Sequence, residues 1–166
     1  MYLKKLILPA LCAFTFLAIS VGCKKSNNST SSTSAISASM GSTAFSISTA
    51  NTTAYYSTDS SAYLIGGFAV SGGDTSGLAI ELYSPFTVDS TITSPYLVFM
   101  DYYVSSTKDY FAGNGVGHIA FTLTTQDTVN HKIAGTFTAT MYNTLNQSDS
   151  LIVTNGKFNT SYFVQP

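Results

Sequence analysis

The 166-residue chain contains no arginine and no tryptophan, and glutamate occurs only once, as Glu81. All seven cationic side chains are lysines, against eight acidic residues. Without arginine, the chain has no planar guanidinium groups for bidentate contacts with phosphate or guanine. A net charge of −1 also offers no basic footprint for a phosphate backbone. These absences exclude nucleic acid as an expected partner.

Charged residues make up only 9% of the chain, but the sequence is not of a disordered type. Hydrophobic residues account for 45% and aromatic residues for 13%, which is enough to bury a core. The polar remainder is mostly Ser, Thr, Asn and Tyr, and beyond residue 22 there are no helix-forming stretches rich in Ala, Glu, Lys and Leu. The composition therefore predicts an extracytoplasmic β domain.

Cysteine is also scarce, with Cys12 and Cys23 the two examples. Met1–Lys5 is a short basic segment, residues 6–21 are apolar, and Gly22 is the small residue before a cleavage point. These are the three parts of a secretory signal, predicted over residues 1–22. Cys12 would be removed with it, so a disulfide is not expected to stabilise the remaining domain.

The end of this segment, Ser20-Val21-Gly22-Cys23, resembles a bacterial lipobox, although Ser20 occupies the position where that family usually has leucine. The resemblance implies cleavage before Cys23 and lipidation of its thiol and amino group. Several acyl chains together anchor a protein stably in a membrane. An ordinary secreted protein and an uncleaved signal anchor are the alternatives. The residue after the cysteine is Lys24 and not the aspartate that keeps some bacterial lipoproteins in the inner membrane, so the outer membrane is favoured. A periplasmic and a surface orientation are both left open.

Residues 23–40 are expected to form the lipidated cysteine and a disordered tether, because Ser, Thr, Asn and Ala dominate there. From residue 41 to 166 the pattern changes to apolar and polar residues in alternation. Examples are Phe45 and Ile47, Ile119 to Leu123, and Ile133 to Met141. This alternation is typical of half-buried antiparallel strands. We predict an all-β antiparallel sandwich of eight or nine strands, with a small up-and-down barrel as the alternative.

Turn signals separate the predicted strands. They include Ser71 to Asp74, Gly113 to Gly115, and Thr125 to Asn130. Pro85 and Pro95 bracket a longer connection. Asn155-Gly156 predicts a tight hairpin between residues 151–154 and 157–164.

The second half of the domain resembles a family of small Bacteroidota lipoproteins that carries only a domain-of-unknown-function label. The shared features are an aromatic residue, a glycine-rich turn, an Ile/Thr strand, an Ile-x-Gly-Thr-Phe strand and a closing Thr-Asn-Gly-x-Phe segment. Here they correspond to Tyr110, Gly113 to Gly117, Ile119 to Thr124, Ile133 to Phe137, and Thr154 to Phe158. The resemblance implies a β fold in the cell envelope. It implies no active site.

Catalytic and metal-binding motifs are sparse. His118 and His131 are the only histidines, and no cysteine or His-x-x-x-His pair accompanies them. Ser105 to Lys108 fits Ser-x-x-Lys, but it lies between predicted strands instead of opening a helix, and we interpret it as a turn. We therefore expect no catalytic residues, no cofactor and no metal.

Three short segments resemble the Asp-Ser/Thr-x acceptor of Bacteroidota O-glycosylation. Their acceptor residues would be Ser90, Thr128 and Ser150, all at predicted turns. The tyrosines have two interpretations. They could form a sugar-stacking or protein-binding surface, or they could fill the core and its rim. We favour the core and rim.

Two functions remain after these exclusions. The favoured one is a non-enzymatic lipoprotein of the outer membrane, a binding or structural module with a glycan or protein ligand. The alternative is a small envelope hydrolase whose site follows no recognised motif.

Overall fold

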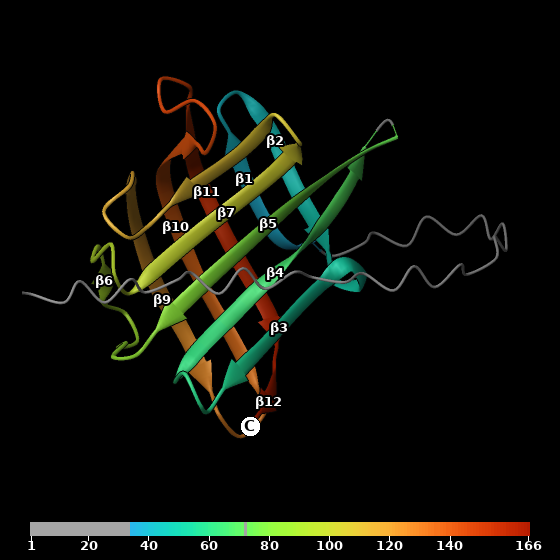
Figure 1. Ribbon diagram of the computed structural model, residues 1–166. Coiled ribbons are helices and arrows are strands. Elements are labelled where there is room, and N and C mark those ends of the chain that lie inside the picture. Colours follow the sequence, from blue (N-terminus) through green and yellow to red (C-terminus); the bar gives the residue numbers. More distant parts are fainter. Residues whose placement is uncertain (1–33, 72) are drawn as a thin grey trace, which may run out of the picture. The chain divides into compact units, whose positions relative to one another are not determined.

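The computed structural model describes residues 34–71 and 73–166, which form twelve strands and one short 3-10 turn (Figure 1). In chain order these are β1 (Ser34–Met40), β2 (Thr43–Ser48), η1 (Thr49–Asn51), β3 (Thr52–Ser57), β4 (Ala62–Ser71), β5 (Asp74–Tyr83), β6 (Thr91–Ile92), β7 (Val98–Ser105), β8 (Lys108–Ala112), β9 (His118–Asp127), β10 (Lys132–Asn143), β11 (Ser150–Ser161) and β12 (Phe163–Gln165). No helix within these residues is long and apolar enough to cross a membrane.

The strands follow one hydrogen-bonded path, in the order β12-β3-β4-β5-β7-β8-β10-β11-β1-β2. Strand β9 pairs with β10, and β6 pairs with β9. Every pairing is antiparallel except β12 with β3. The junction between β8 and β10 is only two residue pairs long, Phe111 with Tyr142 and Tyr110 with Asn143. This short junction divides the path into two halves.

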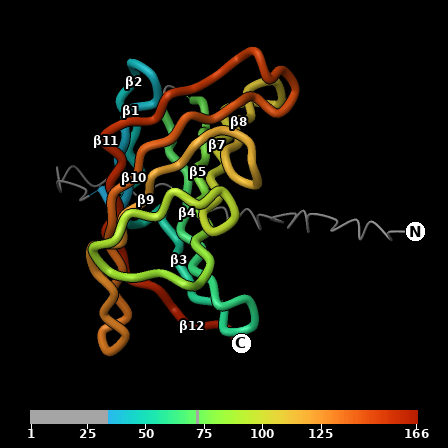
Figure 2. The backbone as a smooth tube through the Cα atoms, turned by 90° about the vertical axis from the view of Figure 1, so that its left-hand side faces the viewer, coloured from blue at the N-terminus to red at the C-terminus, as the bar shows by residue number. Residues whose placement is uncertain are grey.

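The two halves form two layers that cross at a large angle, and Figure 2 shows them edge-on. We call β3, β4, β5, β7, β8 and β12 the front layer, and β1, β2, β6, β9, β10 and β11 the back layer. The predicted all-β fold is confirmed, and its layers fit the predicted sandwich. The path ends at β12 and β2 without closing in the described residues, so the barrel alternative is wrong. Twelve strands replace the expected eight or nine, because short pairings such as β6 carry no clear alternation.

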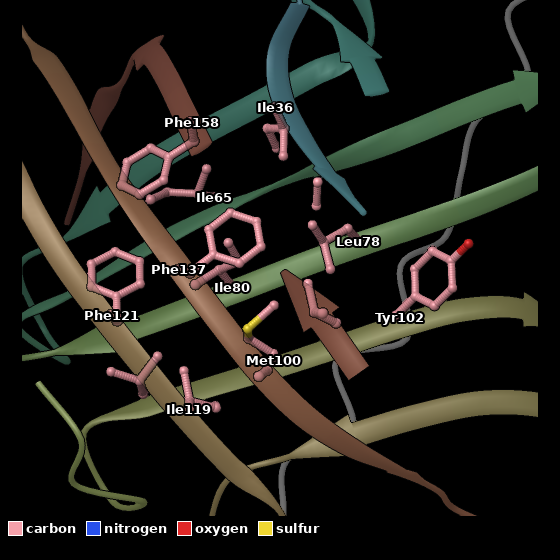
Figure 3. Close-up of a cluster of buried hydrophobic side chains, with 14 of the residues drawn as sticks. Ile36, Ile65, Leu78, Ile80, Met100, Tyr102, Ile119, Phe121, Phe137 and Phe158 are labelled. Atoms are coloured by element: carbon pink, nitrogen blue, oxygen red, sulfur yellow. The ribbon is translucent and has the colours of Figure 1, made fainter. Parts of the chain in front are cut away.

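The core lies between the layers and takes alternate side chains from most of the strands (Figure 3). Ile80 and Met100 point inward from the front layer, and Phe121, Phe137 and Phe158 from the back layer. All five are at least 97% buried. Each such side chain contributes roughly 1.5–3 kcal/mol to folding. The alternation recognised in the sequence therefore sets which side chains face outward.

The first strand corrects the expected boundary between tether and domain. Residues 34–40 were assigned to the disordered tether, but they form β1, which pairs with β11 on one side and β2 on the other. Ile36 is fully buried and Met40 is 5% exposed. Ser37 and Ser39 alternate here with Ile36, Ala38 and Met40, so the segment looks polar in composition although it lies between two paired strands. The rest of the tether, residues 23–33, lies outside the described residues.

The predicted Asn155-Gly156 hairpin is also wrong. Strand β11 continues through both residues, and its register with β10 shifts between Phe137 and Ala139. Asn155 has a φ of 54°, so it forms a β-bulge inside one strand instead of a turn between two. Gly156 leaves the space that the Phe137 ring occupies. The other turn signals do separate strands: β4 from β5, β8 from β9, and β9 from β10.

Candidate binding surface

Alternation along three front-layer strands brings acidic and aromatic side chains to the outside of the domain. Their inward neighbours, Leu82, Val98, Met100, Tyr110 and Ala112, are buried in the core. The outward positions of β5, β7 and β8 are therefore occupied by Glu81, Phe99, Asp101, Asp109 and Phe111. We call these five residues the carboxylate–aromatic face.

Strand register sets a regular arrangement on this face. Glu81 lies opposite Phe99, and Asp101 lies opposite Phe111. Asp109 lies opposite Tyr103, which is 49% exposed. Side chains directly opposite each other in antiparallel strands have Cβ atoms about 4.5–5.5 Å apart. Each carboxylate therefore has a ring beside it on the neighbouring strand.

The rings form a continuous row across the strands. The ring centroids of Tyr83 and Phe99 are 5.6 Å apart, with ring planes at 74°. The centroids of Phe99 and Phe111 are 6.4 Å apart, with ring planes at 39°. The Tyr83 hydroxyl donates a hydrogen bond of 3.0 Å to Oε2 of Glu81. Phe99 and Phe111 are half-buried, so part of each ring faces solvent.

A shallow pocket of about 190 Å³ continues this row where β8 meets β10. It is lined by Phe111, Val116, Tyr142, Asn143, Thr144 and Gln147. Thr144 also donates a hydrogen bond of 3.2 Å to Oδ2 of Asp109, which ties the pocket to the carboxylate–aromatic face. A space of this size accepts one ring of a ligand and not a whole drug-sized molecule.

Buried hydrogen bonds hold the loop beside the pocket in place. Asn143 is 4% exposed, and its Nδ2 donates to the Thr107 carbonyl oxygen at 3.0 Å and to Oδ2 of Asp149 at 3.2 Å. Its Oδ1 accepts a bond of 2.9 Å from the Leu145 amide. The Tyr110 hydroxyl donates to the same Asp149 oxygen at 3.0 Å. A satisfied buried network of this kind fixes the loop that forms the pocket wall.

The carboxylates of the face interact electrostatically. Desolvation by the surrounding protein and the negative charge of Asp109 raise the pKa of Asp101 to about 7, and Glu81 adds to the effect. Asp101 nevertheless has an exposed side chain, so solvent screens part of this interaction. Around neutral pH, Asp101 is therefore poised between its protonated and its ionised form.

Replacing this carboxylate is expected to change how stability depends on pH. The pKa of Asp101 is raised above its ordinary value of 3.8, so the folded protein binds more protons than the unfolded chain between about pH 4 and pH 7. Its stability therefore falls as pH rises through this window. Asp101→Asn removes the effect, and we expect it to be roughly 1 kcal/mol more stable than wild type at about pH 8.

Urea unfolding across this pH range measures the difference. Near pH 4 the wild-type carboxyl is protonated in the folded state, so the advantage of Asp101→Asn should have disappeared. A stability difference that stays the same from pH 4 to pH 8 would show that Asp101 is not the group that titrates.

The residues expected from the sequence to carry modifications are exposed or lie outside the described range. Ser90 is in the connection between β5 and β7, Thr128 is in the turn after β9, and Ser150 begins β11. All three side chains are exposed, so their glycosylation stays a prediction. Cys23 lies outside the described residues.

The two histidines are at opposite ends of the β9–β10 hairpin. His118 begins β9 opposite Thr140, whereas His131 follows the turn and contacts Tyr162 edge-to-face at 5.3 Å between ring centroids. His118 lines a pocket of about 140 Å³ with Pro95 and Ile119, and the described lining residues include no carboxylate. In the described part of the chain, no group of three or more His, Cys, Asp or Glu side chains could hold a metal ion.

The carboxylate–aromatic face was missed in the sequence. Alternation with Leu78, Ile80 and Leu82 places Glu81 and Tyr83 on the outward side of their strand, but the sequence does not show which strands lie beside β5. The available signal was that adjacent outward positions of β5, β7 and β8, such as Glu81, Phe99 and Asp101, are acidic or aromatic, whereas those of β10, such as Thr136 and Thr138, are hydroxyl-bearing. Only the register brings these positions together.

Comparison with known proteins adds no relative. No protein-family model matches the chain, and no curated protein or solved structure is significantly similar to it.

Proposed function

We propose that the chain is a lipid-anchored, non-enzymatic binding module of the outer membrane that holds a glycan against the carboxylate–aromatic face. The observation that carries this proposal is the row of solvent-facing rings beside carboxylates, which continues into a ring-sized pocket. The lipid anchor at Cys23 and the envelope location rest on the signal-like N-terminus.

The chemistry of the face suits a sugar. The face of an aromatic ring is electronegative, so it attracts the weakly positive C–H groups of a pyranose. Carboxylates accept hydrogen bonds from sugar hydroxyls, and Tyr142, Thr144 and Gln147 add polar groups around the pocket. A shallow site with several weak contacts favours an extended chain of sugars over a single small molecule.

Glycan binding can be tested by exchanging rings for aliphatic side chains. Phe99→Leu and Phe111→Leu keep the apolar volume and remove the ring, so folding should be preserved. We expect each exchange to weaken binding about tenfold, which corresponds to about 1.4 kcal/mol. A glycan array of neutral and charged polysaccharides identifies a ligand, and titration calorimetry compares the variants.

Phe163→Leu is the matched control. Its ring is 47% exposed on β12, and three strands of the front layer lie between it and β7. It should bind like wild type. No binding to any glycan on the array would contradict the proposal. Release of reducing ends during the titration, abolished by Asp101→Asn, would instead favour the hydrolase, because a carboxyl with a raised pKa can act as the general acid in glycoside hydrolysis.

The anchor has its own test. Cells expressing the chain are grown with a clickable palmitate analogue, and the label on the protein is measured. We expect complete loss of label in Cys23→Ala and full label in Cys12→Ala, because only Cys23 follows the lipobox-like segment. Unchanged labelling of Cys23→Ala would rule out this anchor.

A further inference from the structure

The carboxylate–aromatic face carries three acidic side chains close together. Glu81, Asp101 and Asp109 lie on three adjacent strands, each diagonal to the next. The charges that act on Asp101 come from the other two acids of the face. Neighbouring like charges on a sheet are destabilising. Strand pairing therefore does not account for the presence of three carboxylates here.

The lysines of the described residues are placed elsewhere. Lys132 and Lys157 belong to β10 and β11 of the back layer, and Lys108 alternates along β8 with the outward Asp109. Three lysines against eight acidic residues leave the described part of the chain with a charge of −5. The face thus attracts a ligand of positive charge and repels an anionic one.

The aromatic rings independently favour a positively charged ligand. An ammonium group is attracted to the face of an aromatic ring. Asp101 lies directly opposite Phe111, so an ammonium group between these strands meets a carboxylate and a ring together. The pocket beside Phe111 and Tyr142 is adjacent and takes the attached ring.

We propose that this face selects glycans that carry protonated amino groups, with the ammonium group held by Asp101 and Asp109 and the sugar ring against Phe111. This inference rests on the proposed glycan function and names its ligand class. The positive charge of the ligand also favours the ionised form of Asp101.

A matched pair of ligands tests the inference: the hexamer of N-acetylglucosamine and its fully deacetylated counterpart. They share one backbone and differ in the charged amino groups. At about pH 7 and low salt, where a substantial share of Asp101 is ionised, we expect wild type to bind the deacetylated hexamer about fivefold more tightly. The double variant Asp101→Asn/Asp109→Asn should bind both hexamers equally. Asp89→Asn is the control, because it removes one charge from the β5–β7 connection outside the face.

The outcomes separate the inference from the function on which it rests. Equal affinity of wild type for the two hexamers would overturn the selection of amino groups and leave glycan binding intact. Spermidine that binds as tightly as the deacetylated hexamer, and equally well to Phe111→Leu, would show that charge alone is recognised and would overturn glycan binding too. Thermal unfolding of each variant confirms that a loss of binding is not a loss of folding.

Discussion

A fragment that begins at Gly41 is expected to be unfolded, whereas a chain that begins at Lys24 is expected to fold. The difference is β1, an internal strand of the back layer that pairs with β11 and β2. Its removal strips both neighbours of a hydrogen-bonded partner and takes Ile36 and Met40 out of the core. Burial of these two side chains alone contributes roughly 3–6 kcal/mol, a large share of the 5–15 kcal/mol that stabilises a typical domain.

Circular dichroism and urea unfolding of the two chains provide the measurement. A third chain with Ile36→Ala isolates the contribution of packing, and it should lose about 2–5 kcal/mol while keeping a cooperative transition. If the fragment from Gly41 unfolds at the same urea concentration as the chain from Lys24, β1 is dispensable and the boundary at residue 41 is right.

The second large effect is expected from Gly156→Ala. A Cβ atom at this position would overlap the ring of Phe137 and lie 2.5 Å from the carbonyl oxygen of the same residue. Phe137 is 2% exposed in the middle of the core, so neither the ring nor the β10 backbone has room to move. We expect a loss of about 3 kcal/mol, which lowers the melting temperature by roughly 10 °C.

Gly77→Ala is the matched control within the same fold. The nearest atom to a Cβ there is the Gly67 carbonyl oxygen at 3.6 Å, an ordinary contact. Alanine should therefore fit, and by restricting the unfolded chain it should stabilise the protein by about 0.5 kcal/mol. Calorimetric melting of both variants compares them directly. If Gly156→Ala has the same melting temperature as wild type, the close contact of Gly156 with Phe137 is contradicted.

The two wrong predictions about strands, residues 34–40 as tether and Asn155-Gly156 as a hairpin turn, have different physical causes. The alternation of large apolar residues, such as Ile133, Phe137 and Met141, correctly identified the inward face of its strand. In β1 the inward positions are Ile36, Ala38 and Met40, where Ala38 contributes little to a hydrophobic pattern and Ser37 and Ser39 make the segment resemble a polar tether. Asn155-Gly156 has the chemistry of a turn, but the left-handed conformation of Asn155 serves a bulge equally well. Local sequence does not distinguish these two uses.

The candidate site could not be predicted from the sequence, for a different physical reason. Glu81, Asp101 and Phe111 are far apart in the sequence, and they share a face only because β5, β7 and β8 are neighbours in one register. Strand order is a long-range property that hydrophobic periodicity does not encode. The pocket depends further on the short junction between β8 and β10, which no turn signal indicates.

The pairing of β1 on both sides also has a mechanical consequence. The chain from the proposed anchor enters the domain at Ser34, the first residue of β1, whereas the carboxylate–aromatic face belongs to the opposite layer. A load that the proposed anchor applies along the axis of β1 would act on both of its strand pairings at once. The hydrogen bonds to β11 and β2 run perpendicular to that axis, so they are loaded together in shear instead of opening one after another. An attachment through β1 is therefore expected to resist a load directed along that strand.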